Sequence, residues 1–202
     1  MRPSTDDFQF IAGNLALDFI NTIGDRLGEA REYLTSSAEL SRWARLAGIV
    51  PPGARFALTP RRLAAVRSAR EDLYRLFHPI ALGAPRPARA SVAALDAGLA
   101  RVAASRRLRV RGRAVRWEWV PSPRDARALL AQVFASAAEL LASGRFVDVR
   151  QCRGEGCGWL FLDRSHAGRR RWCSMSDCGN RNKARRHLAA RRRASALQKR
   201  RS

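Results

Sequence analysis

Residues 150–181 read RQCRGEGCGWLFLDRSHAGRRRWCSMSDCGNR, and this stretch holds every cysteine of the chain: Cys152, Cys157, Cys173 and Cys178. The cysteines form two pairs, each with four residues between its members, and 15 residues separate the pairs. Two close pairs of thiolates have the layout of a tetrahedral zinc site, because each turn supplies two ligands and the loop brings the turns together. The sequence therefore predicts one structural zinc ion on these four cysteines.

Other uses of the cysteines fit the sequence less well. Disulfides are disfavoured, because nothing marks the chain for export and the cytosol keeps thiols reduced. An iron–sulfur cluster also takes four thiolates, but the symmetric pair spacing in a strongly basic setting favours zinc. Unrelated buried cysteines would not be expected to fall within 27 of 202 positions. His166 could replace one thiolate, although a loop histidine between Ser165 and Ala167 is more often exposed.

The residues around the cysteines also fit a small fold built on a metal. Gly154, Gly156 and Gly158 let the backbone turn so that its N–H groups point at the thiolates. Four thiolates on a divalent ion leave a net negative charge, which nearby arginines are placed to offset. These arginines are Arg169, Arg170, Arg171 and Arg181. The pattern leaves no open coordination position, so we expect no catalytic metal.

The charge of the chain is strongly positive, with a formal net value of +22. Residues 164–202 hold 14 basic residues and a single acid, Asp177, so more than half of the excess lies in the last fifth of the chain. An excess of this size favours an anionic partner, and nucleic acid is the commonest one. The C-terminal segment is therefore the predicted anion-binding surface.

A long basic helix is expected after the last cysteine, with Asp177 or Cys178 at its N-terminus and its end near Lys199. Like charges three and four residues apart destabilise a helix, so we expect a polyanion on at least one side of it. The alternative is a solvated, partly disordered basic tail. The candidate nucleic-acid contacts are Arg169, Arg170, Arg171, Arg181, Lys183, Arg185, Arg186, Arg191, Arg192 and Arg193.

The preceding part of the chain is predicted to be helical. Helices are expected to begin at the capping residues Asn14, Ser36, Thr59 and Ser91, and at Ser122-Pro123. The first is expected to extend through Leu27. We place a domain boundary at Gly144, which separates a helical domain over 1–144 from a zinc finger and basic helix over 145–202.

Alternating residues predict one β-hairpin within the helical domain. Leu108 and Val110 precede the turn at 111–113, and Val115, Trp117 and Trp119 follow it, which suggests that one face of the hairpin packs on the core. A second short strand is expected over 146–149. The predicted fold class is thus mainly α, with one small hairpin and a small C-terminal finger.

A polar stripe marks the first helix. Asn14, Asp18 and Asn21 are four and three residues apart, so they share a helix face and could line a pocket for a small-molecule effector. The alternative is an ordinary solvent-facing side of the helix.

Two motifs resemble known families. Residues 173–181, CSMSDCGNR, with FLDRS at 161–165 and RW at 171–172, resemble the CGNR zinc finger, and GNLALDFINT at 13–22 is similar to the start of the ABATE domain that usually precedes it. The resemblance implies a mostly helical bacterial protein of a stress-induced transcription regulator family, with the four cysteines as metal ligands. It also implies that Asp163, Asn180 and Arg181 brace the metal site.

The expected function is therefore that of a zinc-finger DNA-binding transcription regulator, whose helical domain senses a small molecule or forms a homodimer. The alternative is an RNA-binding or ribosome-associated zinc protein. We expect no enzymatic activity, because no Ser/His/Asp arrangement or phosphate-binding glycine loop is present. We find no leader and no apolar run long enough to span a bilayer, so we expect a cytoplasmic, nucleoid-associated protein without a membrane partner.

Overall fold

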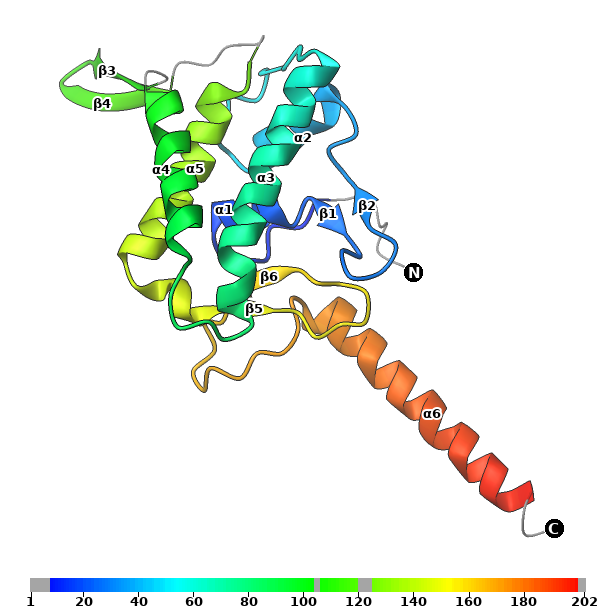
Figure 1. Ribbon diagram of the computed structural model, residues 1–202. Coiled ribbons are helices and arrows are strands. Elements are labelled where there is room, and N and C mark those ends of the chain that lie inside the picture. The colour runs from blue at the N-terminus through cyan, green and yellow to red at the C-terminus, as the bar shows by residue number, and fades with distance from the viewer. Residues whose placement is uncertain (1–7, 104–105, 120–124, 200–202) are drawn as a thin grey trace.

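The computed structural model describes residues 8–103, 106–119 and 125–199, with side chains described over 8–103, 107–115 and 125–191. Helices α3 (Pro60–Ala81), α4 (Arg89–Val102) and α5 (Arg127–Ala142) pack side by side, and the short α1 (Leu15–Ile20) packs against α3 and α5 (Figure 1). Helix α2 (Ser37–Leu46) lies at the end of the body remote from the cysteines (Figure 1), and its Trp43 packs against Phe19 of α1, with ring centroids 5.2 Å apart. The mainly α fold class is confirmed.

Three antiparallel strand pairs complete the fold in the part of the chain that the structure describes. Strand β1 (Ile23–Gly24) pairs with β2 (Arg31–Glu32), and β3 (Arg106–Arg111) pairs with β4 (Ala114–Trp119). Strand β5 (Val149–Gln151) pairs with β6 (Leu160–Leu162), with Arg150 opposite Phe161. The β5–β6 pair lies beneath α1 and α3, next to the base of the C-terminal helix α6 (Asn180–Lys199).

Local capping chemistry sets the start of three helices as predicted. The Asn14 side chain accepts hydrogen bonds from the N–H groups of Ala16 and Leu17. Ser36 accepts from the Glu39 N–H at the start of α2, and Thr59 accepts from the Arg62 N–H at the start of α3.

Two predicted helix boundaries are wrong. Helix α1 ends at Ile20 rather than extending through Leu27, because Ile23 enters strand β1 and the chain then reverses at Asp25, which has a φ of +44°. Helix α4 begins at Arg89, so Ser91 lies inside its first turn and caps nothing. The predicted start at Ser122-Pro123 lies outside the described residues.

The hairpin β3–β4 is present, but its predicted packing is wrong. Leu108, Val110 and Val115 are 57%, 73% and 64% exposed. The hairpin projects beyond the end of α4, where none of the other elements that the structure describes covers it (Figure 1). Alternation identifies strands, but it does not say what lies against the apolar face. The side chains of Trp117 and Trp119 are outside the described set.

The strand predicted over 146–149 is also wrong for most of its length. Residues Arg145–Asp148 form a single 3-10 turn (η2), which follows Gly144 in the left-handed conformation at φ +72°. Only Val149 belongs to a strand, as the first residue of β5.

A single hydrophobic core extends across the predicted boundary at Gly144. Leu17, Phe19 and Ile20 of α1 are fully buried, and so are Leu160 and Phe161 of β6. The strand pair that carries the cysteine segment is therefore part of the core that the helices build, and the two segments are expected to depend on each other for stability.

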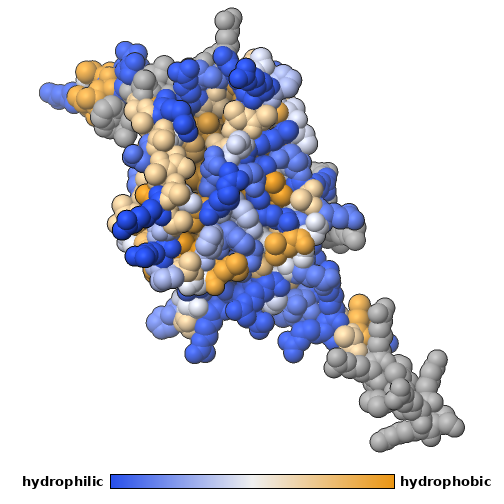
Figure 2. Space-filling model, viewed as in Figure 1, coloured by the Kyte–Doolittle hydropathy of each residue, from blue (hydrophilic) through white to orange (hydrophobic). Residues whose placement is uncertain are grey.

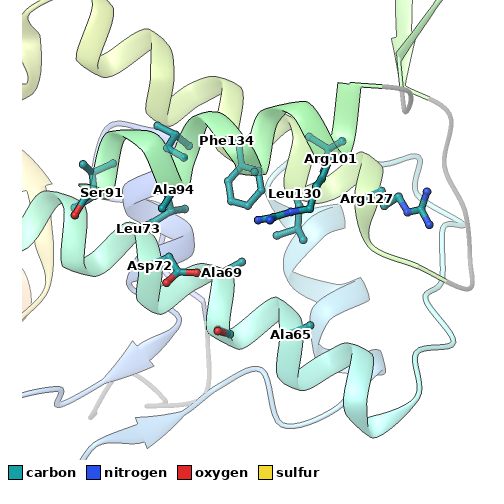
Figure 3. A pocket seen from close by; sticks show the side chains of 15 residues that line it. Ala65, Ala69, Asp72, Leu73, Ser91, Ala94, Arg101, Arg127, Leu130 and Phe134 are labelled. Atoms are coloured by element: carbon teal, nitrogen blue, oxygen red, sulfur yellow. The ribbon is translucent and has the colours of Figure 1, made fainter. Parts of the chain in front are cut away.

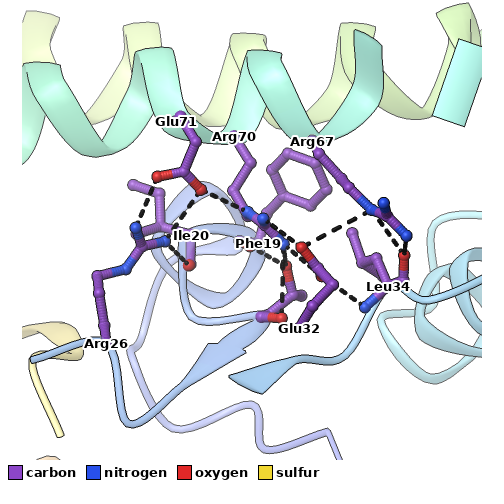
Figure 4. A network of polar contacts seen from close by, with 9 residues as sticks. Phe19, Ile20, Arg26, Glu32, Leu34, Arg67, Arg70 and Glu71 are labelled. Carbon is purple, nitrogen blue, oxygen red and sulfur yellow. Dashed lines mark hydrogen bonds and ion pairs between the residues drawn. The ribbon is translucent and has the colours of Figure 1, made fainter. Parts of the chain in front are cut away.

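A buried ion network holds the β1–β2 segment on α3 (Figure 4). Arg70 of α3 has a side chain only 2% exposed, and it donates to Glu32 at 2.7 and 2.6 Å and to Glu71 at 2.8 Å. Arg26 donates to Glu71 at 2.6 Å. Burial raises the pKa of Glu32, but the hydrogen bonds and charge of Arg70 outweigh it and lower the pKa below its usual value.

Candidate metal centre and basic helix

The four cysteines come together in one buried cluster. Their sulfur atoms all lie within 4.8 Å of one another. The distances are 3.8 Å from Cys157 to Cys173 and 3.6 Å from Cys173 to Cys178. A tetrahedral ion with Zn–S bonds of about 2.3 Å places its ligands about 3.8 Å apart, so the geometry fits zinc. The predicted single zinc site is confirmed, and its role is structural because four protein ligands complete the tetrahedron.

Backbone N–H groups around the cluster donate hydrogen bonds to a cysteine sulfur. Cys152 follows β5, and its sulfur accepts hydrogen bonds from the N–H groups of Gly154 and Cys173, both at 3.3 Å. Hydrogen bonds from the three other thiols lower the pKa of Cys152, which favours a thiolate there. A Cβ atom on Gly154 would lie 2.8 Å from the sulfur of Cys178, so this position has no room for a side chain. Only glycine lets the two turns approach this closely.

One guanidinium contacts the sulfur cluster directly. Arg181 donates to the sulfur of Cys178 at 3.0 Å and pairs with Asp177 at 3.1 Å. Burial lowers the pKa of Arg181, but the Cys178 and Asp177 contacts outweigh it and raise the pKa, so the side chain stays charged. Arg181 thus offsets the thiolate charge, as the sequence suggested. Asn180 instead donates to the carbonyl of Ser176 at 3.2 Å, within the turn that carries Cys178.

Asp163 braces the loop between the two cysteine pairs. Its carboxylate is buried and accepts from the Ser165 N–H and hydroxyl and from the Arg170 N–H. Burial raises the pKa of Asp163, but these hydrogen bonds outweigh it and lower the pKa. The Arg170 guanidinium in turn donates to the carbonyls of Trp172 and Cys173 and lies over the Phe161 ring. Arg170 is therefore engaged inside the protein, whereas Arg169 and Arg171 are exposed.

The last ligand fixes the base of the basic helix. Cys178 lies in a π-helical turn, Met175–Gly179 (η3), which continues without a break into α6. Ser174 caps this turn, so the helical segment begins slightly earlier than predicted. From this base α6 extends away from the body, with Lys199 as its last residue (Figure 1).

The predicted nucleic-acid contacts on α6 are exposed wherever their side chains are described. These are Arg181, Lys183, Arg185, Arg186 and Arg191. Arg185 also pairs with Glu155 of the finger. Arg192 and Arg193 lie within the helix, but their side chains are outside the described set.

A groove of about 490 Å³ runs beside the finger, between the end of α3 and the loop at 168–171. Its walls are rich in arginine, and the space-filling view shows hydrophilic residues over this end of the molecule (Figure 2). The arginines that line the groove are Arg150, Arg153, Arg169, Arg170 and Arg171. Glu155 also lines the groove and pairs with Arg185 of α6, so the groove lies beside the first turns of that helix.

Contacts that seat the finger on the helical body were not predicted. The indole N–H of Trp159 donates to the carbonyl of Ile23 at 2.7 Å, and the N–H of Arg26 donates to the carbonyl of Cys157 at 3.0 Å. Gly158 has a φ of +68°, and a Cβ atom there would lie 2.7 Å from the Leu27 side chain. Both bonds end on a backbone carbonyl, which any residue carries, so they leave no residue pattern to read in the sequence.

The polar stripe of α1 is occupied by the protein's own groups. Asn14 caps α1 and donates to the hydroxyl of Ser136 at 2.9 Å. Asn21 donates to the Leu160 carbonyl at 2.8 Å and accepts from the Leu160 N–H at 3.0 Å. Asp18 accepts from the Ala12 N–H at 2.9 Å. The solvent-facing alternative is wrong for Asp18 and Asn21, which are 8% and 4% exposed.

Replacing Asp18 by Asn is expected to remove a pH-dependent loss of stability. Burial raises the pKa of Asp18 to about 6, from 3.8. When a carboxyl has a higher pKa in the folded than in the unfolded protein, the folded protein loses stability as pH rises from the unfolded-state pKa to the folded-state pKa. For Asp18 this loss is up to about 3 kcal/mol. D18N should therefore become more stable relative to wild type as pH rises from about 4 to about 7, because only wild type has a carboxyl to ionise. Urea denaturation at several pH values measures it, and a constant difference would contradict the expectation.

No helix in the part of the chain that the structure describes is long and apolar enough to cross a membrane.

Two known protein families match the chain. The ABATE family, described as "Putative stress-induced transcription regulator", matches residues 13–144, which is more than half of the chain. The CGNR zinc finger matches residues 149–200. A comparison with curated proteins gives no match. The helical body and the four-cysteine site thus agree with both resemblances, and the chain belongs to the ABATE family and carries a CGNR zinc finger.

Proposed function

We propose that the protein is a DNA-binding transcription regulator without catalytic activity, in which the zinc finger holds the basic helix α6 against the duplex on the nucleoid. The observation that carries this proposal is the attachment of α6 to the metal site. Cys178 lies in the turn that opens the helix, and the described cations of α6 are exposed. A metal-fixed base gives the helix a defined direction, which a flexible basic tail lacks.

The dimensions and charge of α6 support a duplex as the partner. A helix with its side chains is about 10–12 Å across, and the major groove of B-DNA is about 12 Å wide. The residues 180–191 contain no acid, so phosphates on both sides of the groove would meet only cations or neutral groups. The arginine-rich groove of the finger would contact the phosphate backbone beside the helix.

A second candidate function is RNA binding, and the same basic helix supports it. The projecting α6 has few apolar residues and no Phe, Tyr or Trp on which an unpaired base could stack, and His187 is its single aromatic ring. This composition favours a duplex over single-stranded RNA, and we therefore rank DNA first.

A salt titration of DNA binding tests the proposal. If about six cations meet phosphates, the slope of log K against log salt concentration is roughly −5. The double variant R186Q/R191Q should reduce the steepness of that slope by about 2, because each lost phosphate contact removes about 1. R61Q, which removes an exposed arginine at the far end of α3, is the matched control and should leave the slope unchanged.

Three results would count against the proposal. A wild-type slope near −1 would mean that phosphate contacts do not drive binding. Equal slopes for wild type and R186Q/R191Q would remove α6 from the interface. Preference for duplex or single-stranded RNA over DNA in competition at moderate salt would transfer the function to the RNA-binding alternative.

A further inference from the structure

A cleft of about 650 Å³ lies between α3, α4 and α5, remote from the zinc site (Figure 3). Its volume is within the range of about 300–1,000 Å³ that is typical of small-molecule sites. Most of its wall is apolar and comes from all three helices. The main apolar residues are Leu73, Leu76, Leu95, Val102, Leu130 and Phe134.

Small residues keep the cleft open. Ala65 and Ala69 of α3 face it from one side, and Ala94 and Gly98 of α4 face it from the other. A Cβ atom on Gly98 would lie 3.0 Å from the Phe134 ring, so glycine allows this ring to lie directly against α4. Larger side chains at these positions would fill the space that the four small residues leave.

The rim of the cleft carries a free positive charge. Arg101, in the last turn of α4, makes no hydrogen bond or ion pair with the residues that the structure describes, and Figure 3 shows its guanidinium beside Phe134 and Leu130. Asp72 on the opposite wall is already paired with Arg75. Arg127 approaches Asp125 only at 3.7 Å. The charge left without a close partner at the rim is therefore cationic.

We propose that this cleft binds a small molecule that has an apolar body and one carboxylate. The apolar body lies against Leu73, Leu130 and Phe134, and the carboxylate accepts hydrogen bonds from Arg101. Apolar walls supply affinity through burial, and a guanidinium at one end supplies orientation, because a carboxylate and a guanidinium form paired hydrogen bonds. The inference does not depend on whether α6 binds DNA or RNA.

Calorimetric titration of the full-length, zinc-loaded protein with sodium octanoate tests the site. Octanoate should bind at one site per chain and about tenfold more tightly than octanol, which has the same apolar chain without the charge. Octylammonium should bind more weakly than octanol, because its charge has the sign of Arg101. Acetate, which has the charge without the apolar chain, should not bind measurably.

Two variants and a control locate the binding. R101Q should abolish the difference between octanoate and octanol while octanol still binds. Ala94→Phe should abolish binding of both, because a phenyl ring fills the cleft from α4. R89Q, which removes an exposed arginine of α4 that does not line the cleft, should behave as wild type. Thermal midpoints and zinc content confirm that each variant is folded.

Two outcomes would overturn the inference. Octanoate binding that survives in both R101Q and Ala94→Phe would mean that the anion binds elsewhere on this basic protein. A wild-type dimer that Ala94→Phe converts to a monomer in light scattering, without any octanoate binding by wild type, would show that the cleft is a contact between two copies of the chain.

Discussion

Replacing Cys178 by Ser is expected to release the zinc and to destabilise the whole chain, the helical body included. A serine hydroxyl is a poor zinc ligand, and three thiolates bind the ion more weakly than four. Structural zinc in finger peptides contributes on the order of 10–16 kcal/mol of binding free energy, and a typical domain has only about 5–15 kcal/mol of total stability. The free energy lost with the ion is therefore comparable to the total stability of the fold.

The effect reaches the helices because the finger is built into their core. Leu160 exchanges two hydrogen bonds with Asn21, and the Leu162 N–H donates to the Ala12 carbonyl at 2.8 Å. When the cysteine turns loosen, β6 loses the structure that holds it beneath α1, and buried apolar surface is exposed to water. The boundary at Gly144 alone would have suggested that residues 1–144 stay folded in this variant.

Zinc content and hydrogen exchange together measure the effect. C178S should purify with less than one zinc per chain and show faster amide exchange in α1 and α3, as well as a lower thermal midpoint. H166A is the matched control, because His166 is an exposed residue of the same segment and lies outside the sulfur cluster. It should keep its zinc and its exchange protection. Zinc loss with unchanged protection in α1 and α3 would show that the body folds independently.

Features that depend on local chemistry were predictable from the sequence. The spacing of the cysteines identified the zinc site, because ligand geometry is set within two short turns. Asn14, Ser36 and Thr59 marked helix starts, because a cap satisfies N–H groups two or three residues away. The positive charge of the C-terminal segment was predictable by counting its charged residues.

Features that depend on distant partners were not predictable. The apolar face of β3–β4 alternates as a core strand does, yet Val110 is exposed because none of the described helices covers it. Asn21 could equally have faced water or a ligand, and only the position of β6 decides that it bonds Leu160. Arg170 belongs to a run of three arginines, and its neighbours do not show that it alone turns inward.

Replacing Arg70 by Met is expected to destabilise the protein by about 3–5 kcal/mol, because it leaves partly buried carboxylates without their main partner. Met nearly preserves the volume and adds no polar group, so a cavity is not the cause. For a chain of this size the loss corresponds to a fall in thermal midpoint of roughly 6–20 °C. R75M is the matched control, because Arg75 pairs with Asp72 at the surface of the same helix, where an ion pair contributes at most about 1 kcal/mol.

A double-mutant cycle distinguishes the loss of attraction between Arg70 and Glu32 from the cost of leaving the charge of Glu32 unpaired. Glu32 keeps Arg67 at 3.7 Å and the Leu34 N–H at 2.7 Å when Arg70 is removed, but these do not replace two short guanidinium hydrogen bonds. Neutralising Glu32 in R70M/E32Q should therefore recover part of the stability that R70M loses. Additive losses in the double variant would mean that Arg70 acts through its bonds to Thr22, at 3.1 Å, and Glu71, at 2.8 Å, rather than through Glu32.

The pH dependence of the stability of R70M tests whether Arg70 acts through the charges of Glu32 and Glu71. The pKa values of Glu32 and Glu71 are lowered in the folded protein, so their contribution is present above the unfolded value near 4.5 and is lost as pH falls through the folded value. In R70M the burial of Glu32 acts without that offset, so its pKa rises and protonation becomes favourable. The gap between wild type and R70M should thus be widest near neutral pH and should narrow below about pH 4.5. A gap that stays constant with pH would mean that Arg70 stabilises the fold by packing alone, and that the loop carrying Arg26 and Glu32 is held to α3 by apolar contacts.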